Sequence, residues 1–400
     1  MENIISRLFN IPELNIENIA IGATNIIIDV GSPKSSCKCK HCGEESTTVH
    51  QKSYRRVKDL PAFGLEVSLC VTVRQFYCPK CTKYSSETFD FVRPNKHLTI
   101  RYEEWLYKSI TKTNVKAIAE REGLDWKTLQ NIIRHYAPKT FNLVDLWRFV
   151  RQIGMDEIAI AKGHKNYVVV IVDLATGALL DILEGRKKVM LRDYFRAKGS
   201  EFCAQITDFA SDFWKGYHDV AKEVFPNVQI TGDRFHFYSH LQDTVDNTRK
   251  AAQRDPSTKD IEILKKSKFV LLKNTKNLNA KQKEQLAAMR KEPLLNPLIA
   301  IYDCKVKFRD IFEKKISLKK AKTLIDKWKK EAIALGNEYM TTFLTFLEKW
   351  EVPILNYFNK RLSTGRVEGT NNKLKMIKRQ AFGFRNFENF RIKCLIECNS

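Results

Sequence analysis

The sequence predicts a multidomain α/β protein, and three observations predict this class. Two closely spaced pairs of cysteines lie within the first 92 residues. Helical apolar spacing begins after Pro94, and a strand-rich stretch begins at Ile153. A chain of 400 residues has room for roughly two to four domains of ordinary size.

The composition favours a folded protein with an acidic partner. Hydrophobic residues make up 43% of the chain and aromatic residues 11%, which is enough for packed cores and excludes wholesale disorder. The 69 Lys and Arg residues exceed the 46 Asp and Glu residues, giving a formal charge of +23. Such an excess is typical of proteins that bind nucleic acid. A solvated lysine-rich surface is the alternative explanation.

The same sequence argues against membrane insertion and secretion. No apolar run reaches the ~18 residues of a membrane-spanning helix, because the best candidate, Tyr167 to Leu183, contains Asp173 and Asp181. The first residues lack the basic start and apolar core of a signal peptide. We therefore expect a soluble cytoplasmic protein.

The two cysteine pairs predict a zinc site. They are Cys39-Lys-His-Cys42 and Cys78-Pro-Lys-Cys81. Cytoplasmic cysteines are normally reduced, and each Cys-x-x-Cys pair can place two thiolates on one tetrahedral Zn²⁺. Cys37 and His41 lie close enough in sequence to compete as ligands, and four unrelated thiols are the alternative.

The stretch between the pairs predicts a β-ribbon. Apolar residues alternate with other residues along it at Leu65, Val67, Leu69, Val71 and Val73. Alternation with a period of two is typical of a strand with one buried face. A ribbon that joins two metal-binding turns is a zinc ribbon. Buried free thiols are expected for the cysteines without a nearby partner: Cys70, Cys203, Cys304, Cys394 and Cys398.

The segment from residue 114 to 136 resembles a helix-turn-helix. An apolar stripe marks the first helix, Gly123 provides the turn, and Asp125 caps the second helix. Such a second helix can enter the major groove of DNA. Its expected exposed DNA-contacting residues are Trp126, Lys127 and Gln130. An ordinary helical hairpin within a larger domain is the alternative.

The pattern from residue 153 predicts a mixed sheet. Strands are expected over residues 154–160, 166–173, 178–183, 202–210 and 228–232, with helices near 188–197 and 213–224. This order of elements is that of a ribonuclease-H-like domain. The stretch between His236 and Glu368 is helix-like and rich in lysine, which predicts an all-α insertion with Trp328 and Trp350 in its core.

Three carboxylates of this core predict metal-dependent phosphoryl transfer. Asp156 lies on the first strand, Asp212 follows the fourth, and Glu368 begins a late helix. Two Mg²⁺ or Mn²⁺ ions ~3.5–4 Å apart need about three such ligands to clamp the attacking and leaving oxygens. Asp208 is an alternative to Asp212, and any of these acids could instead be a surface or capping residue. Glu157 should point away from Asp156 on the strand.

Basic residues around Glu368 predict contacts with DNA phosphates. Residues 361–400 hold nine Lys and Arg against three Glu, a net charge of 9 − 3 = +6. At helical spacing, Glu368, Asn372, Lys375 and Arg379 share one face. The expected phosphate contacts are Lys375, Lys378, Arg379 and Arg385.

Several short motifs follow one another along nearly the whole chain. Besides the cysteine pairs they are Met155-Asp156-Glu157, Asp212-Phe-Trp-Lys-Gly-Tyr217 with Phe225-Pro-Asn227, Asp233-Arg-Phe-His236, and Val367-Glu-Gly-Thr-Asn-Asn372 with Ala381-Phe-Gly-Phe-Arg385. This ordered set resembles the DDE transposases of the insertion-sequence family written ISL-three. Each motif alone is weak evidence, and their common order is strong.

The resemblance implies an enzyme and its catalytic residues. It implies Asp156, Asp212 and Glu368 as the metal-binding triad, with Asp233 and His236 near the active site. It also implies recognition of the terminal inverted repeats of an insertion sequence, followed by metal-dependent DNA strand cleavage and strand transfer. The expected partners are double-stranded DNA, as transposon ends and target, and further copies of the chain in a homodimer or higher oligomer.

Five segments are expected along the chain. They are a zinc ribbon at 1–92, a helix-turn-helix at 93–145, the first part of the catalytic core at 146–240, a helical insertion at 241–360 and the last part of the core at 361–400. Two other functions stay open. A catalytically inactive DNA-binding regulator derived from a transposase would bind ends without cutting them. A structure-specific nuclease of the same fold class would cut branched DNA without specific ends.

Overall fold

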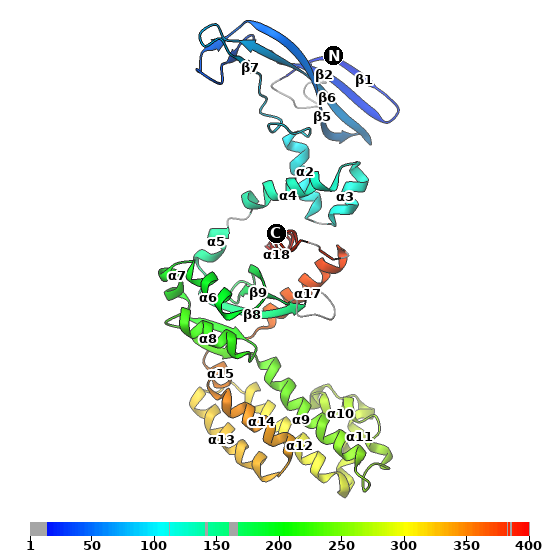
Figure 1. Ribbon diagram of the computed structural model, residues 1–400. Coiled ribbons are helices and arrows are strands. Elements are labelled where there is room, and N and C mark those ends of the chain that lie inside the picture. Colours follow the sequence, from blue (N-terminus) through cyan, green and yellow to red (C-terminus); the bar gives the residue numbers. More distant parts are fainter. Residues whose placement is uncertain are drawn as a thin grey trace. The chain divides into compact units, whose positions relative to one another are not determined.

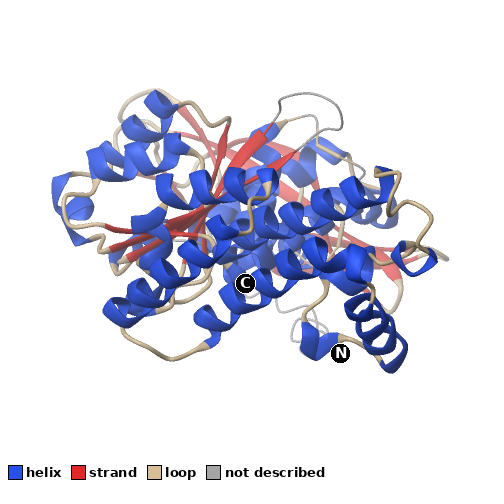
Figure 2. Cartoon of the chain, turned by 90° about the horizontal axis from the view of Figure 1, so that it is seen from below, coloured by secondary structure: helices blue, strands red, loops and turns tan. Residues whose placement is uncertain are grey.

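The computed structural model describes residues 14–111, 113–140, 143–159, 167–381, 383–384 and 386–399. The chain divides into two units, Met1–Thr140 and Phe141–Ser400 (Figure 1). Each contains both strands and helices, which Figure 2 distinguishes by colour. The protein is therefore of the mixed α/β class that the sequence predicts.

A twisted sheet forms the first part of the first unit. Its strands are β1 (Asn15–Ile21), β2 (Asn25–Gly31), β5 (Val49–Ala62), β6 (Leu65–Tyr77) and β7 (Tyr84–Ser86). The order is β1-β2-β6-β5, with β7 paired to β6. The expected alternating strand is confirmed within β6, where Val67, Leu69 and Val71 are buried in the sheet core. A separate two-stranded ribbon contains β3 (Cys37–Lys38) and β4 (Glu45–Ser46).

Three helices follow the sheet and contain the expected helix-turn-helix. They are α2 (Ile100–Ile110), α3 (Val115–Glu122) and α4 (Trp126–Thr140). Gly123 ends α3 with a left-handed backbone at φ 58°, which glycine adopts without strain. The Asp125 carboxylate accepts a hydrogen bond from the Lys127 backbone N–H at 2.9 Å, as expected of a residue that caps α4.

The second unit is built on a five-stranded sheet in the order β10-β9-β8-β11-β12. The strands are β8 (Gln152–Ala159), β9 (Tyr167–Asp173), β10 (Leu179–Glu184), β11 (Asp208–Ser211) and β12 (Gln229–Gly232). β8, β11 and β12 are parallel to one another, whereas β9 and β10 pair antiparallel. The carboxyl ends of the three parallel strands therefore meet at one edge.

Helices cover both faces of this sheet. The helices are α5 (Leu143–Arg148), α6 (Lys188–Arg196), α7 (Ser200–Gln205), α8 (Lys215–Val224), α17 (Gly365–Gln380) and α18 (Phe387–Asn399). Val169 and Ile171 of β9 share a core with α6 and α8. Val168, Val170 and Val172 alternate with them and share the opposite core with α17 and α18.

One expected strand is partly wrong. Residues 202–210 were expected as a single strand, but α7 extends to Gln205 and β11 begins only at Asp208. Phe202, Cys203 and Ile206 pack in the core beside α6, at a spacing that fits a helix as well as a strand. Periodicity cannot separate the two structures over so short an apolar run.

A long helical segment lies between β12 and α17 in sequence. Its helices are α9 (Arg234–Arg254), η1 (Glu262–Leu264), α10 (Lys268–Leu272), η2 (Thr275–Asn277), α11 (Ala280–Lys291), η3 (Pro293–Leu295), α12 (Asn296–Glu313), α13 (Leu318–Ala334), α14 (Glu338–Lys349), α15 (Glu351–Leu355) and α16 (Tyr357–Lys360). Trp328 and Trp350 are buried in its core, as expected. Within the described residues, no helix is sufficiently long and apolar to cross a membrane.

The helical segment is joined to the sheet along β12. The Asn356 side chain donates a hydrogen bond to the Ile230 backbone carbonyl at 2.8 Å. Lys360 forms an ion pair of 2.8 Å with Asp208 at the start of β11. α9 begins directly after β12 and also belongs to the helical core, through Phe237, Leu241 and Val245.

Candidate active site and zinc centre

Four cysteines of the first unit form a cluster of metal-binding geometry. Cys39, Cys42, Cys78 and Cys81 place their sulfur atoms within 4.8 Å of one another. The Cys39–Cys81 and Cys42–Cys78 sulfur pairs are 3.5 Å and 3.6 Å apart. Four thiolates at ~2.3 Å from one tetrahedral zinc would lie about 3.8 Å apart, so the cluster fits Zn²⁺.

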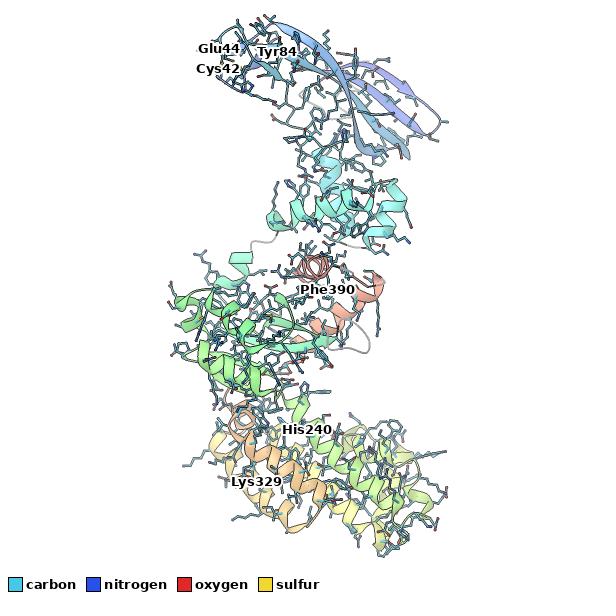
Figure 3. All side chains as sticks on the ribbon, viewed as in Figure 1. Cys42, Glu44, Tyr84, His240, Lys329 and Phe390 are labelled. Atoms are coloured by element: carbon cyan, nitrogen blue, oxygen red, sulfur yellow. The ribbon has the colours of Figure 1, made fainter. Side chains whose placement is uncertain are left out.

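Backbone turns hold these thiols in place. Cys39 accepts the Gly43 N–H at 2.9 Å across one knuckle, and Cys78 donates its own N–H to Lys83 across the other. Hydrogen bonds from the backbone N–H groups of His41 and Cys42 lower the pKa of Cys39 to about 5. Cys42 lies beside Glu44 and Tyr84 at one end of the unit (Figure 3). Cys37 and the exposed His41, the alternative ligands, lie outside the four-sulfur group.

Three aspartates lie at the carboxyl edge of the second sheet. Ala210 of β11 is in register with Gly154 of β8, so Asp212 and Asp156, each two residues further on, reach the same level. Ser211 is in register with Gly232 of β12, which brings Asp233 to that level too. Three neighbouring parallel strands thus each bring one carboxylate to the same edge.

Burial and mutual repulsion disfavour the charged forms of Asp156 and Asp212 at this edge. Burial raises the pKa of Asp156, and the charges of Asp212 and Asp233 raise it further. Burial also raises the pKa of Asp212. The positive charge of His236 opposes both shifts. A cation placed among these carboxylates would remove the repulsion.

His236 is tied to Asp233 across the first turn of α9. The His236 Nδ1 lies 2.6 Å from the Asp233 Oδ2, and this hydrogen bond raises the pKa of His236. Burial alone would raise the pKa of Asp233, but the bond from His236 and further hydrogen bonds lower it. Asp233 also accepts the Phe235 backbone N–H, which confirms it as the cap of α9. His236 is 46% exposed at the side chain.

α17 brings a side-chain amide to one of these carboxylates, Asp156. Asn371 donates a hydrogen bond from Nδ2 to Oδ2 of Asp156 at 2.7 Å. Asn371 is 3% exposed, and its Oδ1 is buried without a hydrogen-bond partner among the described residues. An oxygen acceptor in that state beside the Asp156 carboxylate fits a hard divalent cation, which prefers oxygen ligands.

The close approach of α17 depends on Gly154. A Cβ added at Gly154 would lie 2.6 Å from the Val367 side chain and 2.5 Å from that of Leu174. Arg366 also fixes the start of the helix, because its guanidinium donates to the Leu174 carbonyl at 2.7 Å. β8 and α17 therefore pack tightly enough for Asn371 to reach Asp156.

Glu368, the third expected metal ligand, is not bonded to the other two carboxylates within the described residues. It lies on the exposed side of α17, three residues before Asn371, and so next to it on the helix surface. Among the described residues, no hydrogen bond or ion pair joins the Glu368 side chain to Asp156 or Asp212. The four cysteines are also the one group of three or more metal-binding side chains within 4.8 Å in the part of the chain that the structure describes.

Sequence profiles of known families match three stretches of the chain. A profile described as a transposase, of the DDE type and the ISL3 family, matches residues 153–394. The helix-turn-helix domain of transposase family ISL3 matches residues 87–137, and the zinc finger of the transposases IS204/IS1001/IS1096/IS1165 matches residues 35–81.

The chain belongs to the ISL3 family of DDE transposases. It is 28% identical over 362 residues to the transposase for insertion sequence element IS1001 from Bordetella parapertussis, covering 89% of this chain and 87% of that protein. It is 25% identical over 406 residues to the transposase for insertion sequence element IS1557 from Mycobacterium tuberculosis, covering 94% and 89%. DNA binding is implied by the helix-turn-helix and transposase domains.

Within this transposase, Asp208 and Asp212 have different surroundings. Asp208 is fully buried at the start of β11, where it pairs with Lys360 and accepts a hydrogen bond from Thr207 at 2.8 Å. Asp212 lies at the opposite end of the strand, and its side chain accepts the Trp214 backbone N–H at 3.1 Å. Asp208 therefore links the sheet to the helical segment, whereas Asp212 is near Asp156.

The expected DNA-contacting residues of the transposase are only partly exposed. Trp126 and Lys127 are exposed at the start of α4. The expectation that Gln130 is exposed is wrong, because it is 6% exposed on the side of α4 that packs inward with Leu129 and Ile133. Asn131 and Arg134 lie on the exposed side instead.

The basic residues of α17 are at the surface. Lys375 and Arg379 are exposed, and Lys378 donates a hydrogen bond to the Ala159 carbonyl at 3.2 Å. The prediction for Arg385 lies outside the described residues. Asn371 is a site residue that the sequence reasoning missed, although its place one turn after Glu368 was a usable signal.

Proposed function

We propose that this transposase binds the terminal inverted repeats of an insertion sequence and catalyses metal-dependent DNA strand cleavage and strand transfer. The observation that carries the proposal is the register of β8 and β11, which brings Asp156 and Asp212 to the same height at the carboxyl edge of the sheet. The strand order β10-β9-β8-β11-β12, with helices on both faces, supports a ribonuclease-H-like core. In that reading, the helices from α9 to α16 are an insertion that separates the second carboxylate from the third.

Asp156, Asp212 and Glu368 are the proposed metal ligands. Glu368 is adjacent on α17 to Asn371, which touches Asp156, so a rotation of its side chain can bring its carboxylate toward the other two. Bound Mg²⁺ or Mn²⁺ would activate the attacking oxygen and stabilise the leaving oxygen. The chain's own residues hold two of these carboxylates in position, through the bonds from Asn371 to Asp156 and from Trp214 to Asp212.

Two successive in-line displacements follow from this arrangement. In the first, a water oxygen forms a bond to phosphorus at the transposon end, and the bond from phosphorus to the 3′ oxygen breaks. This leaves a 3′-hydroxyl and a 5′-phosphate. In the second, that 3′-hydroxyl attacks a target phosphodiester and displaces another 3′ oxygen, which leaves as a hydroxyl. Neither step needs a covalent bond between protein and DNA.

His236 is the proposed proton-transfer residue. Its Nδ1 is held by Asp233, so Nε2 is the nitrogen that can face the substrate. The raised pKa of His236 favours the protonated ring, which can deliver a proton from Nε2 to the departing 3′ oxygen. Asp233 is a positioning residue that fixes the ring and its tautomer.

DNA recognition is assigned to both units. In the first, Trp126 and Lys127 at the start of α4 are the proposed contacts with the terminal repeats. In the second, Lys375, Lys378 and Arg379 follow Glu368 along α17 and are proposed phosphate contacts. A homodimer or higher oligomer is proposed, because two ends must be held together.

The test compares Glu368→Gln, Asp156→Asn and Asp212→Asn with the wild type on DNA that carries the element's ends. Binding is measured by gel shift and cleavage in Mg²⁺ or Mn²⁺ by product length. We expect each variant to bind normally and to cleave about 100-fold more slowly or worse. Glu201→Gln, at an exposed acid on α7, is the matched control and should cleave normally.

The outcomes separate the competing assignments. If Glu368→Gln cleaves like the wild type, the third ligand is assigned wrongly. If the wild type binds ends and cuts nothing, the chain is an inactive DNA-binding regulator.

A further inference from the structure

Glu157 occupies the side of β8 opposite to Asp156, as expected from the strand period. It accepts a hydrogen bond from the Tyr217 hydroxyl at 3.0 Å. It also accepts two hydrogen bonds from Nη1 of Arg186, at 2.9 Å and 3.1 Å. The side chain of Glu157 is 11% exposed, so a nearly buried carboxylate anchors this arginine.

Two aromatic rings complete the support of Arg186. The guanidinium carbon lies 5.3 Å from the ring centre of Tyr167 and 5.4 Å from that of Trp214. Contacts of a cation with aromatic faces at this distance are attractive and fix the plane of the guanidinium. Arg186 is therefore held from several sides, although 47% of its side chain is exposed.

The anchored guanidinium keeps donors for another molecule. Glu157 takes hydrogen bonds from Nη1, while Nε and Nη2 have no hydrogen-bond partner among the described residues. A guanidinium presents its N–H groups in a planar fork that matches two oxygens of a phosphate. Holding the side chain in advance lowers the entropy lost when a ligand binds.

This arginine lies at the active-site edge of the sheet. Trp214, which Arg186 contacts, donates its backbone N–H to Asp212 at 3.1 Å. Gly185, the preceding residue, bonds to the Tyr167 carbonyl at the start of β9, next to the end of β8.

We propose that Arg186 binds a DNA phosphate adjacent to the phosphodiester that is cut, and so positions the strand over Asp156 and Asp212. The inference rests on the proposed function and adds a substrate contact to it. Phosphates entering this edge meet three carboxylates, so they need fixed hydrogen-bond donors beside those carboxylates. Because Glu157 balances its charge, Arg186 acts by directed hydrogen bonds rather than by general attraction.

Other basic residues nearby lack this arrangement. Arg192 of α6 lies 3.3 Å from Glu223 of α8, in an ordinary ion pair between two helices. It has no aromatic support among the described residues, and it lies on α6, the helix that follows Arg186 in sequence. Arg192→Gln is thus a matched control for Arg186→Gln.

The experiment measures single-turnover cleavage of end DNA by the full-length wild type, Arg186→Gln, Arg186→Lys and Arg192→Gln. Loss of a charge-assisted hydrogen bond of about 1.5–3 kcal/mol corresponds to roughly a 10-fold to 100-fold slower rate for Arg186→Gln. Arg186→Lys keeps the charge without the fork and should be intermediate. Arg192→Gln should match the wild type, and end binding, carried also by the first unit, should change little.

A second measurement locates the contact on the DNA. Single methylphosphonate linkages, which remove the charge of one phosphate, are placed in turn around the cut. At one linkage, the cleavage rate of the wild type should fall by the same factor by which Arg186→Gln is slower on ordinary DNA. At that linkage the cleavage rate of Arg186→Gln should not fall further. This dependence would not arise if Arg186 only stabilised the fold.

The outcomes separate this inference from the proposed function. The inference alone is overturned if the wild type and Arg186→Gln cleave end DNA at the same rate. It is also overturned if every methylphosphonate linkage slows both proteins equally. A wild type that cuts no end DNA overturns the proposed function and the inference with it. If Arg186→Gln does not fold, Arg186→Lys and the linkage scan decide in the same way.

Discussion

The side-chain amide of Asn371 donates a hydrogen bond to the carboxylate of Asp156 across 2.7 Å, joining α17 to β8 at the centre of the candidate site. The two residues are 215 positions apart in the sequence. This bond fixes one oxygen of Asp156 and leaves Oδ1 of Asn371 buried without a partner among the described residues. Asn371 is therefore a positioning residue for the carboxylate.

We predict that Asn371→Ala slows cleavage about 10-fold to 100-fold without weakening end binding, because residues that orient metal ligands have effects of this size. Asn371→Asp should also slow cleavage, since a second carboxylate would repel Asp156. Single-turnover rates and gel shifts measure both effects. Asn359→Ala removes a comparable amide bond, to Gln229, and should leave cleavage unchanged. Unchanged cleavage by Asn371→Ala would contradict the positioning role.

Asp212→Asn should stabilise the metal-free protein at neutral pH. Burial raises the pKa of Asp212 in the folded state. Folding stability therefore falls as pH rises from the unfolded pKa, near 3.9, through the folded pKa, and stays lower above it. A neutral side chain avoids this penalty, so the melting temperature in EDTA at pH 7 should rise by about a few degrees. The gain should disappear at acidic pH.

The matched control for this stability effect is Asp219→Asn. The hydrogen bond from Lys188 lowers the pKa of Asp219, so this carboxylate contributes stability at neutral pH. Asp219→Asn should not raise the melting temperature. Added Mg²⁺ should stabilise the wild type more than Asp212→Asn, because a ligand stabilises the state that binds it. A destabilised Asp212→Asn in EDTA would show that its carboxylate is instead paired.

His236 should make stability depend on pH with the opposite sign. The bond to Asp233 raises the pKa of His236, so its contribution is fully present below the unfolded pKa, near 6.5, and is lost as pH rises through the folded pKa. His236→Gln should therefore flatten the decline in stability above pH 6.5. Urea denaturation from pH 6 to pH 9 measures the slope.

His240 is the control on the same helix. Burial lowers its pKa, so it costs stability at low pH and this cost disappears as pH rises to the unfolded pKa. His240→Gln should raise stability below pH 6.5 and have little effect above it. The same direction of change in both variants would refute the assignment of the His236–Asp233 bond.

The zinc site should hold one ion through four sulfur atoms. Cys42→Ser should abolish stoichiometric zinc, measured by atomic emission, and unfold the ribbon around β3 and β4, because structural zinc sites couple binding to folding. Cys37→Ser and His41→Ala should keep one zinc per chain, since both side chains lie outside the group. Loss of zinc in either control would change the ligand set.

Local patterns predicted much of the fold. Alternation in β6, the left-handed Gly123 and the capping Asp125 are local signals, and each is present as expected. Strand β11 was predicted to begin too early, because Phe202 and Cys203 fit either a helix or a strand. The exposure of Gln130 was misjudged because helical spacing does not say which neighbouring elements cover a side chain.

The candidate site was harder to predict, because it is assembled from distant segments. The motifs around Asp156 and Asp212 pointed to this edge. The register that brings the two residues to the same height depends on the pairing of β8 with β11. The bond from Asn371 and the support of Arg186 by Tyr167 and Trp214 depend on packing between elements. Sequence spacing within one element carries no signal for such contacts.

The continuity of α9 has a mechanical consequence. The helix starts at Arg234 beside the carboxylates and runs without interruption to Arg254, a length of about 30 Å at 1.5 Å per residue. Its first turn carries His236, and its later turns are built into the core of the helical segment through Leu241 and Val245. An uninterrupted helix resists bending, so its two ends move together. Any tilt of the helical segment against the sheet, such as DNA lying on it would impose, must therefore swing the imidazole relative to Asp156 and Asp212.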